Sequence, residues 1–409
     1  MRFTTQLLHR NFDPDKTTGS TTQPIYQTSA YYQPTAEDMV RVFNGRQPGF
    51  VYTRVGNPTL ASFERRLAAL EGGIGAVSFA SGMSAVSMSI MNIVGAGDEI
   101  VSNGSLFGGT GDFFRELSTY NVTIKYVASS NVEDFASLIT EKTKLIYAET
   151  IGNPKLDIVD IEALAKLAHS YNLPLFIDNT VTTPYLVKPL SLGADVVIHS
   201  TSKAINGNGN SIGGVVVVGS KFKWNADKFP KLKDFTKFKA MSYLVKLRTT
   251  MLTDFGGCMS PFNAYLTGIG LDTLALRMER ACNNALQLAE FCMKRDNVIV
   301  NYPGLETNTY HALAKKQFNN RYGTMMTLKL GSQERAFKFI NSLKYALNVS
   351  NIGDARTLVI HPCSTIYLHA SDEAKKNADV TEDLVRVNVG IEDIEDLIED
   401  FSQAFRNLE

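Results

Sequence analysis

Cysteine is scarce in this 409-residue chain, neither sign of charge is in excess, and no long hydrophobic run occurs. The four cysteines form no CxxC pair, and Cys282 and Cys292 would stand about 15 Å apart along a shared helix, too far for a disulfide. We therefore expect reduced thiols and a cytoplasmic location. Lys and Arg number 41 and so do Asp and Glu, which argues against nucleic-acid or membrane-surface binding and favours a small-molecule partner.

Targeting, metal-binding and nucleotide-binding signals are also absent. Residues 1–19 lack the apolar segment of a signal peptide, and apolar runs such as 215–218 are far too short to cross a bilayer. The six histidines show no HExxH or other metal-ligand spacing, so we predict no metal site. No GxxxxGK[ST] loop occurs, and the run 207–214 does not fit GxGxxG because Ile212 occupies the third glycine position.

Residues 209–213 match the GxSxG pattern of a hydrolase nucleophile, with Ser211 at the centre. Such a nucleophile requires a strand before the serine and a helix after it. Here a polar coil precedes Ser211 and the strand-like run 215–218 follows it, so the order is wrong. A serine hydrolase that uses Ser211 is kept as a remote alternative.

Three parts follow one another along the chain. Residues 1–57 are rich in Thr, Gln, Tyr and Pro with little helical period, which is typical of an extended arm that packs on a partner subunit. In residues 58–250 short apolar runs alternate with helical patterns, which predicts an α/β domain whose mostly parallel sheet is covered by helices on both faces. Residues 251–409 combine long helical patterns with a few strand-like pieces, as in a smaller α+β domain.

Local signals place several elements. One helix is expected from the Asn57-Pro58 cap to Gly72, and a crossover helix from an Asp160 cap. The expected strands are 76–79, 99–101, 144–147, 173–177, 196–198 and 214–218, with 324–328 and 384–389 in the second domain. The second domain is also expected to carry a long helix through 271–291 and a final helix through 391–405. Ligands of parallel sheets bind outside the carboxyl ends of the strands.

Polar residues that suit a carbonyl cofactor follow two of the expected strands. Lys203, in Ser200-Thr201-Ser202-Lys203, comes just after the strand 196–198, where its amine can hold such a cofactor as an imine. Asp178 ends the strand 173–177, and a carboxylate there keeps a pyridine nitrogen protonated, the state in which pyridoxal acts as an electron sink. A surface lysine and a helix-capping aspartate are the ordinary alternatives. The presence of both residues at strand ends favours a pyridoxal-phosphate site.

An anion site is expected beside this pair. The strand 76–79 runs into the small-residue turn Ala80-Ser81-Gly82-Met83-Ser84, and a helical pattern begins at Ala85. A helix N-terminus after such a turn presents backbone N–H groups and a positive dipole end to an anion. Ser200 and Ser202 can add hydroxyl donors to the same anion.

Together these residues resemble the Cys/Met-metabolism pyridoxal-phosphate enzymes, the cystathionine γ-synthase-like group. The resemblance covers nearly the whole chain and rests on Lys203 in its Ser-Thr-Ser-Lys setting, Asp178-Asn179-Thr180, Ser81-Gly82-Met83, and Tyr52-Thr53-Arg54 with Asn57-Pro58-Thr59. It implies an α/β fold, fold type I of the PLP-dependent transferases, with a mostly parallel sheet of the seven-stranded type flanked by helices and a smaller C-terminal α+β domain.

The resemblance also implies roles around the cofactor, pyridoxal 5'-phosphate. Lys203 holds it as a Schiff base, Asp178 pairs with its ring nitrogen, and Phe107 stacks on the ring. The remaining cofactor-binding residues are expected at the phosphate: Ser81, Gly82, Met83, Ser200 and Ser202, with Tyr52 and Arg54 supplied by a neighbouring subunit. A dimer is therefore the minimum, and a homotetramer built from dimers is expected.

Within the group, the stretches 260–264, 276–280 and 351–362 are similar to O-acetylhomoserine sulfhydrylases. The third, with Gly353-Asp354-Ala355, is the most specific, since lyases and cystathionine γ-synthases usually carry Gly-Gly-Val/Ala-Glu there. By resemblance Arg386 binds the substrate α-carboxylate, a task suited to a planar bidentate donor. Asn153 and Ser350 match positions near the substrate.

Several positions depart from the family pattern. Phe107 stands where many relatives have Tyr, so it has no phenol to move a proton, and Gly109 replaces a cysteine of methionine γ-lyases. The stretch 362–367 replaces a more usual Pro-Ala-Ser-Thr-Thr-His, with Cys363 expected as a small buried filler. Asn388 replaces a more usual Ser.

The resemblance implies γ-replacement on O-acetyl-L-homoserine by sulfide or methanethiol, which gives homocysteine or methionine together with acetate. The Lys203 amine, brought close to neutral pKa by desolvation, is expected to remove the α-proton and then move a β-proton. A methionine or homocysteine γ-lyase and a cystathionine γ-synthase of the same family are alternatives, as is a non-catalytic, cofactor-binding regulatory protein. The preferred acyl group and the physiological thiol stay open.

Overall fold

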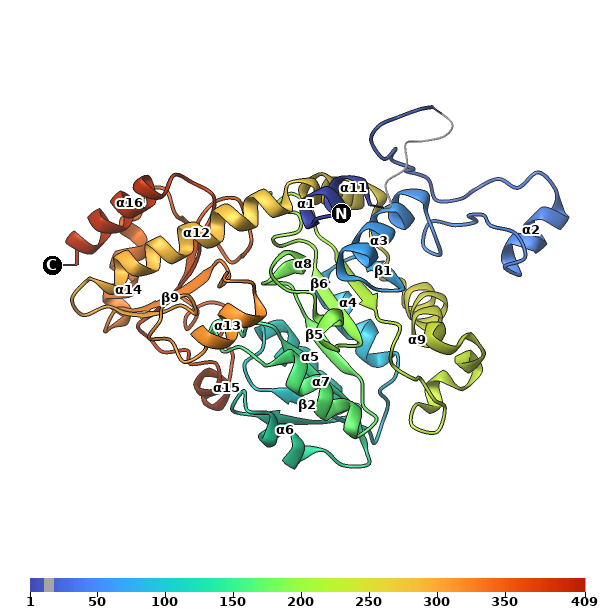
Figure 1. Ribbon diagram of the computed structural model, residues 1–409, viewed down its shortest axis with the longest axis horizontal. Coiled ribbons are helices and arrows are strands. Elements are labelled where there is room, and N and C mark those ends of the chain that lie inside the picture. Colours follow the sequence, from blue (N-terminus) through green and yellow to red (C-terminus); the bar gives the residue numbers. More distant parts are fainter. Residues whose placement is uncertain (11–17, 409) are drawn as a thin grey trace.

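The computed structural model describes residues 1–10 and 18–408. Its larger sheet has seven strands in the order β1-β7-β6-β5-β4-β2-β3, seen at the centre of Figure 1. Neighbours from β3 to β6 in this order are parallel, whereas β7 is antiparallel to both β1 and β6. The strands are β1 (Gly75–Phe79), β2 (Glu99–Asn103), β3 (Thr123–Val127), β4 (Thr143–Glu149), β5 (Leu175–Asp178), β6 (Val196–Ser200) and β7 (Gly214–Val218).

The predicted mostly parallel sheet is confirmed, and each predicted strand of the first domain overlaps an observed one. β3 is the exception, since no predicted strand corresponds to it. It lies at the sheet edge beside β2 only, and its residues 123–126 are not buried. An edge strand of this kind lacks the apolar run by which a central strand is recognised.

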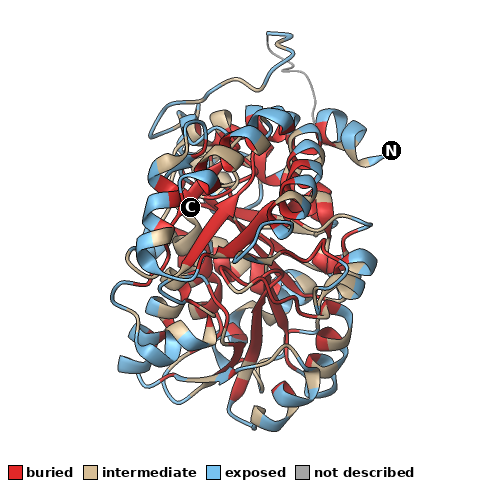
Figure 2. Cartoon of the chain, turned by 90° about the vertical axis from the view of Figure 1, so that its left-hand side faces the viewer, coloured by how far each residue is buried: buried red, intermediate tan, exposed pale blue. Residues whose placement is uncertain are grey.

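Helices cover both faces of this sheet. Alternate residues of a strand point to opposite faces, so that Ile146 of β4 joins one hydrophobic cluster while Leu145 and Tyr147 join the other. One face packs against α3 (Pro58–Glu71), α6 (Val132–Leu138) and α7 (Ile161–Ser170), and the other against α4 (Gly82–Met91), α5 (Gly108–Thr119) and α9 (Ser242–Lys246). Figure 2 shows the buried strands enclosed by helices with exposed outer faces.

The predicted helix caps are present. The Asn57 side chain accepts hydrogen bonds from the N–H groups of Thr59 and Leu60, and Gly72 ends α3 with a positive φ of 82°. The Asp160 side chain accepts from the Ala163 N–H at the start of α7. Shorter elements connect these units: α8 (Thr183–Leu186), α10 (Thr253–Phe255), the 3₁₀ helices η1 (Pro189–Leu192) and η2 (Pro230–Met241), and the π-helical segment η3 (Leu247–Leu252).

The smaller sheet belongs to the C-terminal part. Its five strands, in the order β10-β11-β12-β9-β8, are β10 (Leu347–Asn348), β11 (Leu358–Ile360), β12 (Leu384–Asn388), β9 (Met325–Lys329) and β8 (Ile299–Asn301). The helices of this part are α11 (Pro261–Asp272), α12 (Leu274–Met293), α13 (His311–Gln317), α14 (Gln333–Ser342), α15 (Asp372–Asn377) and α16 (Ile394–Arg406).

Two helix predictions in this part need correction. The long helix expected through 271–291 is interrupted at Thr273, which separates α11 from α12. The final helix begins at Ile394, so Ile391 lies before it. Cys282 and Cys292 do share α12, and both are buried free thiols.

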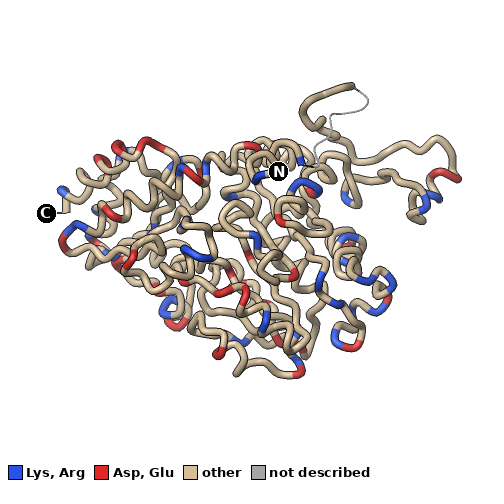
Figure 3. The backbone as a smooth tube through the Cα atoms, viewed as in Figure 1, with Lys and Arg blue, Asp and Glu red and all other residues tan. Residues whose placement is uncertain are grey.

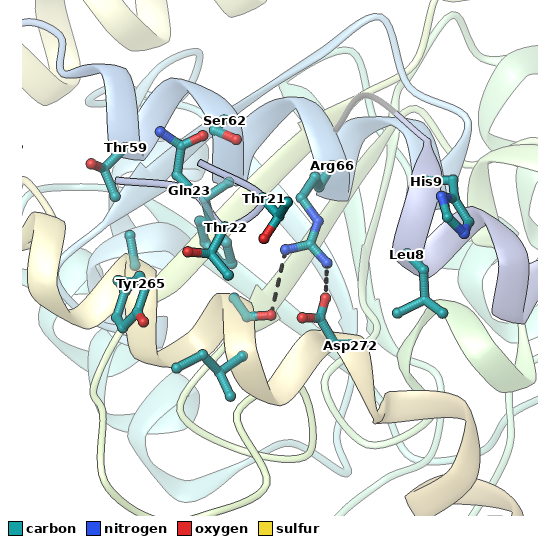
Figure 4. A pocket seen from close by; sticks show the side chains of 14 residues that line it. Leu8, His9, Thr21, Thr22, Gln23, Thr59, Ser62, Arg66, Tyr265 and Asp272 are labelled. Carbon is teal, nitrogen blue, oxygen red and sulfur yellow. Dashed lines mark hydrogen bonds and ion pairs between the residues drawn. The ribbon is translucent and has the colours of Figure 1, made fainter. Parts of the chain in front are cut away.

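The N-terminal arm is mostly extended but carries two short helices that its sequence pattern does not indicate, α1 (Phe3–His9) and α2 (Ala36–Phe43). Arg66 of α3 anchors the arm, because its guanidinium donates to the Leu7 carbonyl (2.9 Å). The same guanidinium pairs with Asp272 of α11, as Figure 4 shows. Residues 11–17 of the expected arm lie outside the described residues.

Charged side chains of both signs occur in the N-terminal, central and C-terminal parts of the molecule (Figure 3). Among the helices in the described ranges, none combines the length and apolar character that crossing a bilayer requires.

Candidate functional site

A cavity of about 400 Å³ lies at the carboxyl ends of β4, β5 and β6, between the larger sheet and the C-terminal part. It gathers all the predicted site residues except Tyr52 and Arg54. Its lining includes Ser81, Gly82, Met83, Phe107, Asn153, Asp178, Ser200, Ser202, Lys203, Ser350 and Arg386. Residues at the starts of α4 and α5, at the ends of β5 and β6, and on β12 thus meet at the sheet edge where ligands of parallel sheets bind.

Lys203 follows β6 directly and projects into this cavity. Its Nζ donates a 2.6 Å hydrogen bond to the Asn351 side-chain oxygen. Burial, assisted by the positive charge of Arg386, lowers the pKa of Lys203 from 10.5 to about 8. With this pKa roughly a tenth of the amine is unprotonated at pH 7, far more than in an ordinary lysine, and the unprotonated form is the one that a nucleophile or base requires.

Asp178, at the end of β5, presents a carboxylate with spare acceptor capacity. Its Oδ1 accepts from the Thr180 N–H (2.9 Å), while Oδ2 has only a long contact with the Tyr147 hydroxyl (3.5 Å). No Lys or Arg of the described chain lies within ion-pair distance of it, and burial raises the pKa of this carboxyl. A protonated ring nitrogen placed against Oδ2 would satisfy this carboxylate.

The residues of the predicted anion site lie at the N-terminus of α4. Ser81 caps the helix by accepting from the Ser84 N–H (3.1 Å), which leaves the N–H groups of Gly82 and Met83 without an intrahelical partner. A β-carbon at Gly82 would lie 2.5 Å from the Ser200 β-carbon. Only glycine therefore lets β6 and its serine approach the helix end closely enough to share one anion.

Phe107 stands at the N-terminus of α5, is 40% exposed and lines the cavity. Its backbone N–H donates to Glu149 Oε1 (2.6 Å), so a buried carboxyl fixes the start of this helix. A β-carbon at Gly109 would lie 2.7 Å from the Phe107 ring and 3.3 Å from the Met83 sulfur. The absence of a side chain at Gly109 therefore sets the position of the ring.

Arg386 of β12 is 4% exposed, and no carboxylate of the described residues pairs with it. Its guanidinium donates to the Asn153 side-chain oxygen (3.1 Å) and to the Asn351 carbonyl oxygen (3.0 Å). Burial lowers the pKa of Arg386 to about 10. A buried cation with only neutral partners is suited to bind an anionic ligand group.

Tyr52 and Arg54 do not reach this cavity within the chain. The Arg54 guanidinium donates to the Thr253 carbonyl and lies 5.5 Å from the centre of the Tyr52 ring. Arg54 instead lines a separate cavity of about 580 Å³ near α3 and β1.

The hydrolase alternative is wrong. Ser211 contacts the Asn263 carbonyl and the Thr267 hydroxyl, each at 3.1 Å. It precedes β7 and is followed by no helix, so the strand, turn and helix of a nucleophile elbow are missing.

Among the lining residues with a carboxyl or amide side chain, two were not predicted. Glu149, which ends β4 as Asp178 ends β5, lines the cavity, and Asn351 supplies the acceptor for Lys203. The available signals were the position of Glu149 at the end of an apolar strand and that of Asn351 two residues before Gly353-Asp354-Ala355.

Residues that depart from the family pattern also have defined contacts. Cys363 is only partly buried, beside a small cluster that includes Tyr367, which corrects the expected buried filler. The Tyr367 hydroxyl lies 3.0 Å from the Leu106 carbonyl oxygen and 3.2 Å from that of Asn153. The Asn388 side-chain oxygen accepts from the Gly353 N–H (2.6 Å).

Known proteins resemble the chain over its whole length. The homocysteine synthase of Schizosaccharomyces pombe is 42% identical over 98% of this chain and 97% of its own length. The O-acetyl-L-homoserine sulfhydrylase of Leptospira meyeri is 40% identical over 98% and 96%. A crystal structure described as an O-acetylhomoserine (thiol)-lyase of Campylobacter jejuni, which contains N'-pyridoxyl-lysine-5'-monophosphate, matches with a TM-score of 0.94 at 30% identity, covering 99% of this chain and 100% of its own.

The donor set of the cavity fits pyridoxal phosphate. The helix end with Gly82 and Ser200 suits the phosphate, the spare oxygen of Asp178 suits the ring nitrogen, and the Lys203 amine suits the aldehyde. The model of the family described as Cys/Met metabolism PLP-dependent enzyme matches residues 4–406. The chain belongs to this family, and its cofactor is pyridoxal phosphate.

Proposed function

We propose that the protein catalyses γ-replacement on O-acetyl-L-homoserine with sulfide, giving L-homocysteine and acetate, and that methanethiol in place of sulfide gives methionine. The observation that carries this proposal is the buried, unpaired cation of Arg386 in the same cavity as the low-pKa amine of Lys203. An amino-acid substrate held through its carboxylate by Arg386 brings its α-carbon to a base. The names of the two relatives above support the choice of reaction.

Bound pyridoxal phosphate supplies an electron sink for carbanions next to the substrate nitrogen. Lys203 removes the α-proton as a general base and then moves a β-proton. The bond between Cγ and the ester oxygen breaks with its electron pair on acetate, and a bond from sulfur to Cγ forms in its place. Arg386 and Asn153 orient the substrate, and Ser350 lies near it. These roles are proposals for residues that line one cavity.

Further residues are assigned to the cofactor. We propose that Asp178 keeps the ring nitrogen protonated and that Phe107 stacks on the ring. The phosphate would be held by Ser81, Gly82, Met83, Ser200 and Ser202. Since Phe107 carries no hydroxyl, the proton transfers fall to Lys203 in this scheme.

The decisive experiment combines a visible spectrum with an assay. Purified wild type should show the absorbance of lysine-bound cofactor, and Lys203→Ala should lose it. O-acetyl-, O-succinyl- and O-phosphohomoserine are then supplied with sulfide, and homocysteine and ammonia are measured. Homocysteine from the acetyl ester supports the proposal. Faster release of ammonia and 2-oxo acid from methionine or homocysteine without added thiol would identify a γ-lyase. Faster use of cysteine than of sulfide would identify a cystathionine γ-synthase. A coloured protein that turns over none of these substrates would indicate a regulatory role.

We further propose a cytoplasmic homotetramer built from dimers, in which Tyr52 and Arg54 complete a neighbour's site. Their distance from the chain's own cavity supports this assignment. The arm 1–57, the cofactor domain 58–250 and the C-terminal domain 251–409 are the proposed units. The large sheet lies wholly within the second and the small sheet within the third.

Mixing two inactive variants tests the shared site. A subunit with Arg54→Ala keeps Lys203, and a subunit with Lys203→Ala keeps Arg54, so a mixed dimer regains one complete site. Random reassociation should restore about a quarter of the wild-type sites. No recovery, with mixed dimers demonstrated by mass, would show that Arg54 serves its own subunit.

A further inference from the structure

Asn351 joins the two residues on which the proposed reaction depends. Its side-chain oxygen accepts from Lys203 Nζ (2.6 Å), and its backbone carbonyl accepts from Arg386 (3.0 Å). In the described part of the chain, Lys203 has no carboxylate within ion-pair distance, and Asn351 is its hydrogen-bond acceptor. The amine is therefore oriented by a neutral group.

The turn that carries Asn351 is fastened to the segment that carries Lys203. Gly353 has a φ of +71°, and a β-carbon there would lie 2.3 Å from the Ala204 nitrogen. The Ala355 N–H donates to the Gly207 carbonyl (2.8 Å), and Gly353 is held from its other side by Asn388. The acceptor is thus part of a packed contact between the two parts of the molecule and keeps a set position relative to the amine.

Arg277 also holds the segment that carries Lys203. Its guanidinium donates to the carbonyl oxygens of Ala204 (2.7 Å) and Ile205 (3.3 Å). Arg277 thus holds the backbone directly after Lys203, and Asn351 holds the tip of the Lys203 side chain.

A neutral amide differs from a carboxylate in what it does to an amine. Both accept a hydrogen bond and can orient Nζ, but a carboxylate would also stabilise the ammonium form and raise the pKa of Lys203. The amide oxygen orients the amine without opposing the lowering of the Lys203 pKa by burial and by Arg386.

We propose that Asn351 is a positioning residue, whose side-chain oxygen directs the Lys203 amine during proton transfer while its backbone carbonyl independently fixes Arg386. The inference deepens the proposed function and rests on it for the identity of the protons moved. It predicts a separation of effects, because a side-chain substitution removes the contact with Lys203 but retains the backbone contact with Arg386.

The variants are Asn351→Asp and Asn351→Leu, with Asn348→Asp as a control that adds the same charge at an exposed site on β10. Cofactor-free protein is recombined with pyridoxal phosphate between about pH 6 and pH 10, and the rate is followed by absorbance. Only unprotonated Lys203 reacts, so the wild-type midpoint should lie near its pKa of about 8. Asn351→Asp should raise the midpoint by about one pH unit or more, and the control should not move it.

In turnover, Asn351→Leu should lower kcat about tenfold or more while the KM for O-acetylhomoserine stays within about twofold. A midpoint of Asn351→Asp equal to that of the wild type, or an Asn351→Leu enzyme with unchanged kcat, would overturn the proposal. If the wild type recombines as described but turns over no acylhomoserine, the proposed function fails while the midpoint shift still tests Asn351.

Discussion

Glu149 and Asp178 occupy paired positions at the ends of the adjacent parallel strands β4 and β5, and both carboxyls face the cofactor cavity. Burial, together with the proximity of Asp178, raises the pKa of Glu149 well above its ordinary value. Burial and the neighbouring Asp178 therefore both disfavour the ionised form of Glu149, so that in the cofactor-free protein Glu149 keeps its proton to a higher pH than an ordinary carboxyl does.

This relationship predicts how Glu149→Gln changes the pH dependence of stability. The unfolded chain releases the Glu149 proton above about pH 4.5, whereas the folded protein keeps it to a higher pH, so rising pH in that interval favours the unfolded state. Glutamine imitates the protonated acid and can still accept from the Phe107 N–H. Thermal unfolding of cofactor-free protein should show the Tm of Glu149→Gln increasing relative to the wild type as pH rises from about 5 to 8.

The exposed Glu133 on α6 provides the control. The plots of Tm against pH for Glu133→Gln and for the wild type should be parallel. Parallel curves for Glu149→Gln as well would mean that this carboxyl is ionised in the fold, and the proton assignment would then be abandoned.

Arg386→Lys should weaken substrate binding more than turnover. Lysine keeps the positive charge but cannot donate from a planar fork to Asn153, the Asn351 carbonyl and a carboxylate together. The KM for O-acetylhomoserine should rise about 10- to 100-fold, corresponding to the loss of one charge-assisted hydrogen bond. Steady-state kinetics at saturating sulfide measure this, and an unchanged KM would place the substrate carboxylate elsewhere.

Much of the fold could be predicted because its signals are local. The Asn57 cap and Gly72 stop define α3 by chemistry within one turn of the chain. The break at Thr273 and the edge strand β3 could not be predicted, because neither has a strong local signal. Leucines at 271 and 274 continue an apolar pattern across the break between α11 and α12.

The site divides in the same way. Asp178 and Lys203 could be placed together because the ends of parallel strands meet at one sheet edge. Glu149 has the same placement on β4 but belongs to no motif that marks it. The contact of Asn351 with Lys203 spans 148 positions of sequence and depends on how the C-terminal part packs against the larger sheet, which no local pattern contains.

Lys203→Met should stabilise the cofactor-free protein at neutral pH. The pKa of Lys203 is about 8 in the fold and 10.5 unfolded, so below pH 8 the folded state carries the full cost of burying a charge. The lowering of the pKa from 10.5 to about 8 corresponds to a cost of roughly 3 kcal/mol, and loss of the Asn351 hydrogen bond offsets about 1 kcal/mol of the gain. Denaturant unfolding should show the advantage of Lys203→Met decreasing as pH rises from about 8 toward 10.5. An advantage that does not change with pH would show that burial of the ammonium is not its source.

Two glycines of α5 allow a paired test of the Phe107 position. A β-carbon at Gly109 would meet the Phe107 ring at 2.7 Å, whereas one at Gly111 would have no neighbour within 4 Å. Both substitutions by alanine favour the helix by roughly 0.5–1 kcal/mol, so Gly111→Ala should raise Tm slightly and leave kcat unchanged. Gly109→Ala should displace the ring and lower kcat several-fold, with a shifted visible spectrum of the bound cofactor. Because the helix gain is common to both variants, equal kinetics and spectra for the two would show that the ring does not contact the reacting groups.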